Sequence, residues 1–202
     1  MSEYYMFHKP GGCITARRDA RHKTVMDYFP ESARDVLFPI GRLDKDTEGL
    51  LLVTDDGVFN YNLLTPEREV PKTYFFQVLG TLTEEEIRNI EQGVKIYKNR
   101  DFETSPAKIT VEGISTLGEI KEYLSAEDLK LSQRKPTLPV TSGHITITEG
   151  KKHQVKRMLR SVGCRVVYLK RMKIGPLSLD EHLQKGEYRS LSCEEIALLT
   201  SL

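Results

Sequence analysis

The stretch GRLDKDTEGLLLVTDDG, residues 41–57, constrains the fold more than any other part of the chain. Its apolar run Leu50–Val53 is short and continuous and is bounded by glycines and acidic residues, a pattern typical of a buried strand. Asp55, Asp56 and Gly57 then form a turn that can cap a helix. The sequence therefore predicts an acidic loop, a buried strand, and a helix over residues 58–64 that ends before Pro66.

Further strand and helix patterns follow one another along the chain without strict alternation. Alternating or β-branched runs predict strands at 4–10, 72–80, 105–112, 143–150 and 164–175. Capping signals and apolar stripes predict helices at 23–29, 83–94, 152–163 and 192–199. We expect an α+β fold with a mixed, largely antiparallel sheet. Its 202 residues suit one domain, 1–202, in which residues 113–143 form an insertion with one helix over GEIKEYL and a polar loop.

Composition narrows the class of protein. Hydrophobic residues make up 39% and charged residues 29%, as in ordinary globular domains, and no apolar run approaches the ~18 residues of a membrane span. The N-terminus carries no signal-peptide pattern. The three cysteines are widely spaced and contain no C-x-x-C pair, so neither a disulfide framework nor a zinc site is indicated. We expect a cytoplasmic protein.

Positive charge is concentrated in one part of the chain. The net charge is only +1, but residues 151–173 hold nine Lys or Arg and no Asp or Glu. A solvated helix face would explain a shorter cluster. The absence of compensating acids here favours a polyanionic partner.

The acidic stretch allows several interpretations. Its carboxylates could bind a metal ion, but their spacing fails the calcium-loop pattern, and the signal for a two-metal nuclease is weak. Asp44 differs because it lies just before the buried strand, where a carboxylate is costly unless a cation pairs with it. Arg42 and Lys45 are near in sequence, and Lys156 lies at the border of the apolar stripe of the basic helix. An Asp–Lys pair in a cleft is a plausible nucleophile or base, although spacing alone favours a structural ion pair.

Two further side chains allow both a packing and a functional interpretation. Tyr74, on the predicted strand 72–80, could pack in the core or stack on a base. His153, on the basic helix, could act as a general base or contact a phosphate. The KPGG stretch, residues 9–12, is predicted to be a turn that ends the first strand.

Taken together, the motifs resemble one enzyme family. GRLDKDTEGLLLVTDDG resembles the signature segment of pseudouridine synthases, in particular the RsuA-type ribosomal RNA branch. FHKPGG is similar to the first motif of that branch, and PKTYFFQV to its K-x-Y strand. EGKKHQVKRMLRSVGCRVVYLKRMKIGPLSL and GEYRSL resemble its C-terminal motifs, in the same order along the chain.

The resemblance implies a fold and a reaction. It implies the pseudouridine synthase α+β fold with a basic active-site cleft, and the isomerisation of uridine in ribosomal RNA to its C-glycoside without a cofactor or metal. Asp44 matches the essential carboxylate, Lys156 the cation beside it, and Tyr74 the ring that packs against the target base. Arg42 matches the arginine that stabilises the space left by the flipped base. We expect the RNA to be contacted by Arg42, His153, Gln154, Arg157, Lys170 and Arg171.

Several expectations concern the partner and the target. The partner would be ribosomal RNA or an assembly intermediate of a ribosomal subunit, with no membrane, and the protein a monomer. The stretches KTYF and HQVKRM slightly favour a small-subunit target. The alternatives are a large-subunit enzyme, a non-catalytic RNA-binding assembly factor, and a metal-dependent phosphodiester enzyme. Relatives of this branch commonly carry a small N-terminal RNA-binding domain, which we expect to be absent because the chain begins almost at the KPGG motif.

Overall fold

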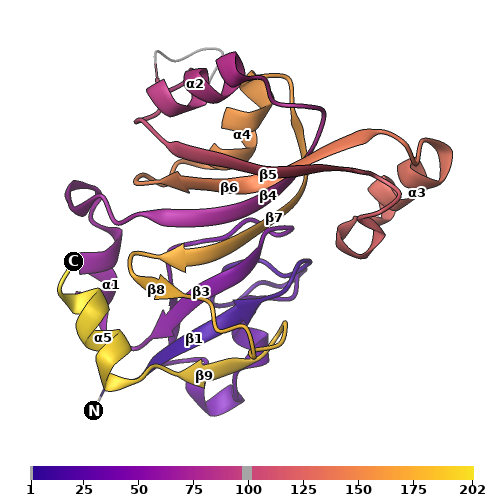
Figure 1. The fold of residues 1–202 in the computed structure, drawn as a ribbon. Helices are drawn as coiled ribbons and strands as arrows, with labels where there is room; N and C mark the ends of the chain where they lie inside the picture. Colours follow the sequence, from indigo (N-terminus) through magenta and orange to yellow (C-terminus); the bar gives the residue numbers. More distant parts are fainter. Residues whose placement is uncertain (1, 97–101) are drawn as a thin grey trace. The chain divides into compact units, whose positions relative to one another are not determined.

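The computed structural model describes residues 2–96 and 102–202, which form two compact units (Figure 1). Unit 1 comprises Met1–Lys72 and Lys170–Leu202, and unit 2 comprises Thr73–Leu169. Strand β7 (Arg165–Ile174) begins in unit 2 and ends in unit 1. Helices and mostly antiparallel strands are interspersed along the chain, so the predicted α+β class is confirmed. Within the described ranges, no helix is long and apolar enough to cross a membrane.

The strands of unit 1 follow the order β7-β3-β1-β9, and the short strands β2 and β8 pair with β3 and β7. Their bounds are β1 Tyr4–Lys9, β2 Phe38–Ile40, β3 Glu48–Thr54, β8 Leu177–Ser178 and β9 Tyr188–Ser190. Strand β3 is antiparallel to β1 and parallel to β7. Leu50–Val53 are at most 1% exposed, which confirms the predicted buried strand.

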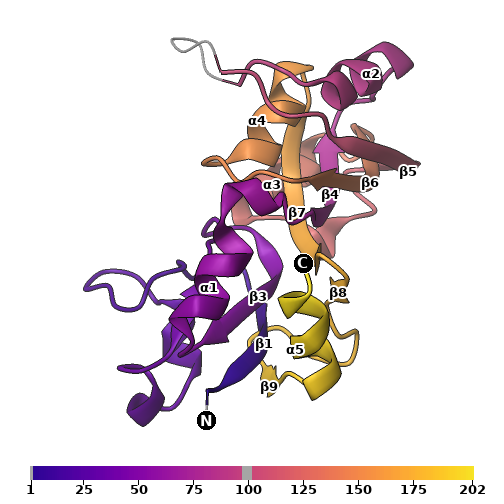
Figure 2. The same ribbon diagram turned by 90° about the vertical axis from the view of Figure 1, so that its left-hand side faces the viewer.

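Two helices cover one face of these strands. Helix α1 (Gly57–Leu64) and helix α5 (Cys193–Thr200) lie on the same side of unit 1 (Figures 1 and 2), where their buried faces enclose Met6, Leu50 and Leu52. The predicted helix start is confirmed because Asp56 accepts hydrogen bonds from the backbone N–H groups of Val58 and Phe59 at 2.9 and 3.0 Å. The predicted helix over 23–29 is instead a 3₁₀ helix, η1 (Val25–Tyr28). Two more 3₁₀ turns, η2 (Glu31–Ala33) and η3 (Pro66–Arg68), belong to the same unit.

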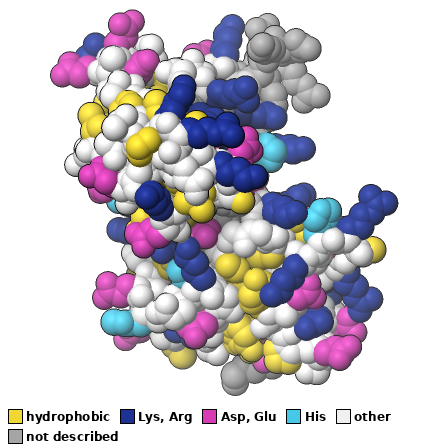
Figure 3. Space-filling model, turned by 90° about the vertical axis from the view of Figure 1, so that its right-hand side faces the viewer, with side chains coloured by type: hydrophobic (Ala, Val, Ile, Leu, Met, Phe, Trp, Pro, Cys, Tyr) yellow, Lys and Arg dark blue, Asp and Glu magenta, His cyan; other side chains and the backbone are white. Residues whose placement is uncertain are grey.

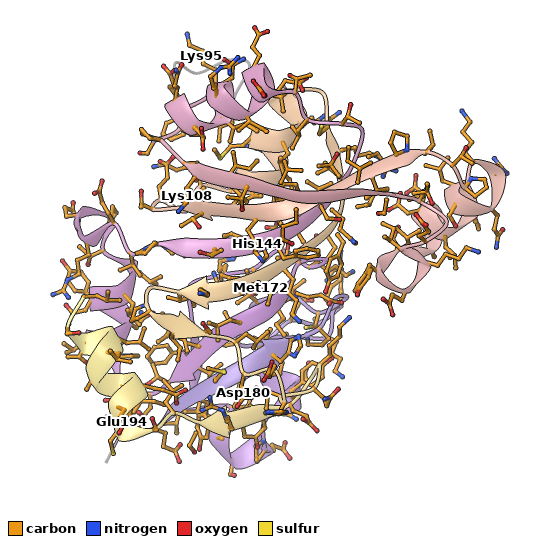
Figure 4. The ribbon with its side chains drawn as sticks, viewed as in Figure 1. Lys95, Lys108, His144, Met172, Asp180 and Glu194 are labelled. Atoms are coloured by element: carbon orange, nitrogen blue, oxygen red, sulfur yellow. The ribbon has the colours of Figure 1, made fainter. Side chains whose placement is uncertain are left out.

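An arginine joins the last strand of unit 1 to its last helix. Arg189 on β9 donates two hydrogen bonds to Glu195 at 2.8 and 2.9 Å, and its Nε donates to Asp180 (labelled in Figure 4) at 2.7 Å. Hydrogen bonding to Glu195 raises the pKa of Arg189 and lowers that of Glu195. Because Glu195 also caps α5 through Ser192, this pair fixes the helix against the sheet.

The strands of unit 2 follow the order β5-β6-β4-β7. Their bounds are β4 Lys72–Leu79, β5 Lys108–Thr116 and β6 Pro139–Ile147, with β5 and β6 antiparallel and a bulge between Val111 and Gly113. Helix α2 (Glu84–Gln92) and helix α4 (Gln154–Ser161) lie on one side of them (Figure 1). The capping signal of the helix predicted over 83–94 is confirmed, because Thr83 and Glu86 form a capping box.

The segment 113–143 differs from its predicted secondary structure. Its ends extend β5 and β6, and residues 121–123 of the expected helix form only a 3₁₀ turn, η4 (Lys121–Tyr123). The α-helix of this segment, α3, spans Ala126–Arg134 because Ser125 accepts a hydrogen bond from Asp128 N and caps it. Leu117, Ile120 and Val140 form a small buried core, against which Leu79 of β4 and Val167 of β7 also pack. That the segment is an insertion stays a prediction.

Candidate active site

Asp44 lies in unit 1, in the loop that leads from β2 into β3. Its carbonyl accepts a hydrogen bond from Thr47 N at 3.1 Å, which closes a turn. Leu43 and Thr47 are buried on either side, whereas Asp44 is half-buried and Arg42 is exposed. The loop is therefore anchored at both ends and presents one partly accessible carboxylate between the anchors.

Lys9 anchors the C-terminal side of this loop. Its side chain is fully buried, and its ammonium donates to three carbonyl oxygens, those of Pro10 at 3.0 Å, Lys45 at 3.3 Å and Thr47 at 2.8 Å. An ammonium has three donors, so all of them are used. Gly12 N adds a bond to Lys45 O at 2.8 Å, from a backbone with φ of +91° that favours glycine. The KPGG stretch is thus more than the predicted turn, because Lys9 and Gly12 are hydrogen-bonded to the loop that carries Asp44.

Thr15 anchors the N-terminal side of the loop. Its hydroxyl donates to Leu43 O at 2.8 Å and accepts from Leu43 N at 3.1 Å. Both residues are buried. The residue immediately before Asp44 is therefore bonded through both of its backbone polar groups, and the segment 9–15 holds the Asp44 loop from both sides.

Most of the other acidic residues of the 41–57 stretch have structural partners. Asp55 accepts a hydrogen bond from Glu3 N at 2.8 Å, Asp56 caps α1, and Glu48 forms a 2.7 Å ion pair with Lys185. Among the residues that the structure describes, no group of three or more His, Cys, Asp or Glu side chains is arranged to hold a metal ion.

Lys170 and Arg171 lie where β7 runs beside β3. Gly49 has a φ of +104°, and a Cβ there would lie 2.2 Å from Arg171 O, so only glycine allows this close pairing. Arg171 is 4% exposed and donates through Nε to Leu50 O at 2.8 Å. Lys170 is half-buried, and burial lowers its pKa. The observed contact of Arg171 anchors β7 to β3, and its expected role in RNA binding stays a prediction.

The neighbour of Lys9, His8, is buried in its neutral form. It is 5% exposed, its Nδ1 donates to Leu183 O at 2.7 Å, and its Nε2 is buried without a hydrogen-bond partner. Burial lowers the pKa of His8 below its ordinary value of 6.5.

We expect His8 to make the folded state sensitive to acid. As the pH falls through about 6.5, His8 takes up a proton in the unfolded chain before it does so in the folded protein. The free energy of unfolding therefore decreases between pH 6.5 and the lower pKa of His8 in the folded state. The melting temperature of the wild type should therefore fall more between pH 7.5 and 5.5 than that of His8→Gln, which keeps an N–H donor for Leu183. His182→Gln, at an exposed position, should follow the wild type. Equal slopes for all three proteins would contradict this assignment.

The other candidate residues lie in unit 2. Tyr74 is on β4 and is 8% exposed. On α4, Val155, Met158 and Leu159 are buried, which confirms the predicted apolar stripe. Lys156 and Arg157 are half-buried beside that stripe, and His153 is exposed just before the helix. Figure 3 shows one face of the molecule, on which many Lys and Arg side chains (dark blue) are exposed. The predicted pairing of Lys156 with Asp44 joins the two units and stays a prediction.

Glu149 and Gln154 hold the loop that starts the basic helix. Gln154 is 3% exposed, its amide nitrogen donates to Glu149 at 2.7 Å, and its amide oxygen accepts from Lys151 N at 2.8 Å. Glu149 also accepts from Ser105 N at 2.7 Å. Between these bonds His153 adopts a left-handed backbone with φ of +55°, which is uncommon outside glycine. The observed contacts of Gln154 are therefore with protein, and its expected contact with RNA stays a prediction.

Glu149 was not recognised in the sequence, although it is the last acid before the basic segment. Glu149→Ala removes the acceptor of two hydrogen bonds, so we expect a loss of about 2 kcal/mol of stability. We also expect weaker RNA binding with kcat nearly unchanged, because loop 149–153 carries the exposed Lys151, Lys152 and His153. Titration of RNA and steady-state kinetics would separate the two effects. Glu149→Gln keeps an acceptor oxygen and should restore binding, and a failure to do so would argue against this role.

Comparison with known proteins identifies the class. The model of the RNA pseudouridylate synthase family matches residues 3–161. The chain belongs to this family and is an RNA pseudouridine synthase, as its motifs suggested.

Individual relatives resemble the chain over nearly its whole length. The uncharacterized RNA pseudouridine synthase YtzG of Bacillus subtilis (strain 168) is 44% identical to it, over 97% of this chain and 72% of the relative. The ribosomal small subunit pseudouridine synthase A of Escherichia coli (strain K12) is 34% identical over 96% of this chain and 72% of that protein. A crystal structure of a pseudouridylate synthase superposes with a TM-score of 0.80 at 32% identity, over 98% of this chain and 74% of the other.

Proposed function

We propose that this chain converts one or more uridines of small-subunit ribosomal RNA to pseudouridine. The proposal is carried by the likeness to proteins named ribosomal small subunit pseudouridine synthase A, 32–35% identical over at least 96% of this chain. The substrate would be the RNA itself or an assembly intermediate of the small subunit. The protein would act in the cytoplasm as a monomer.

The proposed catalytic group is Asp44. In the reaction the bond from C1′ to N1 breaks, the uracil turns, and a bond from C1′ to C5 forms, while C5 loses its proton and N1 gains one. The carboxylate either attacks C1′ or takes a proton from the ribose to form a glycal. The target nucleotide must leave its stack to reach this group. A half-buried carboxylate between two anchored residues suits either route, because it needs little reorganisation during the reaction.

The remaining roles follow from the family motifs. Lys156 would keep Asp44 ionised, and Tyr74 would pack against the target base and assist removal of the C5 proton. Arg42 would stabilise the space that the flipped base leaves, and its exposure agrees with a contact to RNA. His153, Arg157 and Lys170 would contact the RNA, together with Gln154 and Arg171 if their side chains become accessible in the complex.

Mapping pseudouridines in both ribosomal RNAs, from cells with and without this protein, tests the proposal. We expect one or more sites to vanish from small-subunit RNA and to return when purified protein is added to unmodified transcript. Sites that vanish only from large-subunit RNA would support the alternative target. Unchanged maps of both RNAs, together with retained RNA binding, would favour the non-catalytic assembly factor.

A further inference from the structure

A second basic element lies outside the predicted basic segment. Residues 17–23, of sequence RRDARHK, contain four Lys or Arg, one His and one Asp. All seven residues are exposed. We call this segment the 17–23 loop. Neither the motif analysis nor the proposed mechanism gives it a role.

The loop has a defined conformation. At its base Ile14 N donates to Lys23 O at 3.0 Å. At its tip the Asp19 carboxylate accepts from the backbone N–H groups of Arg21 and His22, each at 2.8 Å. Lys23 places its ammonium 3.8 Å from the centre of the Tyr28 ring. Asp19, the only acidic residue of this loop, is thus hydrogen-bonded to the loop backbone. The Lys and Arg side chains therefore extend from a backbone of defined conformation.

Two of the arginines already pair with one aspartate. Arg17 donates to the backbone oxygen of Asp35 and Arg18 to its carboxylate. The side chains of Arg18 and Asp35 are 78% and 69% exposed. Ion pairs this exposed contribute at most about 1 kcal/mol, whereas an arginine can bind a phosphate through two parallel hydrogen bonds. A polyanion can therefore displace these pairs.

The base of the loop is tied to the Asp44 loop. Thr15, which makes both hydrogen bonds to Leu43, precedes Arg17 by only two residues. Two residues span at most about 7 Å. The 17–23 loop therefore begins close to the backbone that carries the Asp44 carboxylate, within unit 1.

We propose that the 17–23 loop is a binding site for RNA backbone phosphates next to the target uridine, with Arg17, Arg18 and Arg21 as the principal contacts. The proposal rests on the proposed function, since the partner is RNA. It adds a second basic surface to the helix α4 segment. Bound phosphates there would fix the register of the RNA strand over Asp44, while base identity would be read elsewhere.

The test measures binding without turnover. In the Asp44→Asn background, small-subunit RNA transcript is titrated over a range of salt concentrations, with and without Arg17→Ala/Arg18→Ala/Arg21→Ala. Each phosphate contact to a single strand contributes about 0.7 to the slope of log K against log salt, so the triple variant should lower the slope by about 2. With Asp44 intact, the triple variant should raise KM for the transcript.

A matched control removes three exposed charges elsewhere. Arg88→Ala/Lys130→Ala/Arg134→Ala acts on α2 and α3 of unit 2 and should leave the slope unchanged. An unchanged slope in the loop variant, or an equal loss in the control, would overturn the proposal. Melting curves verify that each variant is folded. Failure of the proposed function would look different, because the protein with Asp44 intact would then form no pseudouridine in the transcript.

Discussion

Replacing Asp44 with Asn should reduce pseudouridine formation by about 10⁴-fold or more, the size of effect seen when an essential catalytic group is removed. Asparagine keeps the shape of the side chain but can neither attack C1′ nor accept a ribose proton. Because the carboxylate is only half-buried and its loop is held through backbone groups, the melting temperature should change little. RNA affinity should also change little. The measurement is single-turnover pseudouridine formation on saturating small-subunit transcript.

Asp46→Asn is the matched control, since it makes the same substitution two residues further along the same loop at an exposed position. We expect it to retain near-normal turnover. If Asp44→Asn kept more than about a tenth of the wild-type rate, Asp44 could not be the essential group, because even one transition-state interaction contributes more than that.

The parts of the fold that the sequence predicted correctly rest on local signals. Leu50–Val53 form the buried strand because a short, continuous apolar run between turn residues is typical of a strand buried on both faces. Asp56 capped α1 and Thr83 capped α2 because a side chain bonds to backbone only two or three residues away. The apolar stripe of α4 is also a local signal, because it depends only on residues three and four positions apart. Such signals predict an element correctly whatever its neighbours in the folded protein are.

The wrong helix in 113–143 shows where local signals compete. GEIKEYL has helix-forming residues, but Leu117 and Ile120 are drawn into a small core with Val140, and the chain turns there. The cap at Ser125 starts the helix at Ala126, about two turns after the predicted start. Tertiary packing decided between two plausible starts.

The contacts that build the site could not be predicted because they join distant residues. Lys9 reaches Thr47 across 38 residues, Thr15 reaches Leu43 across 28, and Ser105 reaches Glu149 across 44. A periodic pattern gives the face of an element but not its neighbours. The resemblance to a known family pointed to Asp44 as the catalytic residue. The role of segment 9–15 in holding the Asp44 loop is visible only in the three-dimensional structure.

That arrangement makes Lys9→Met the second change with a large expected effect. Methionine fills similar space but removes all three hydrogen bonds of the ammonium. Thr47 O then loses its 2.8 Å donor, whereas Lys45 O keeps the bond from Gly12 N. Burial lowers the pKa of Lys9, which shows that burying this cation is itself unfavourable. Removing the cation therefore offsets part of the stability that the lost hydrogen bonds provided, and we expect a net destabilisation of about 2 kcal/mol.

The loss of activity from Lys9→Met should exceed what this destabilisation explains. A displacement of Asp44 by about 1 Å can cost on the order of 100-fold in rate, so the single-turnover rate should fall by about that factor while KM for RNA changes little. The rate is measured at a temperature where the variant is fully folded, with Lys135→Met, at an exposed position, as the control. If folded Lys9→Met turned over at the wild-type rate, Lys9 would serve stability alone. If the rate stays low, Lys9 is a positioning residue, because its ammonium donates to the backbone oxygens of Lys45 and Thr47 in the loop that carries Asp44.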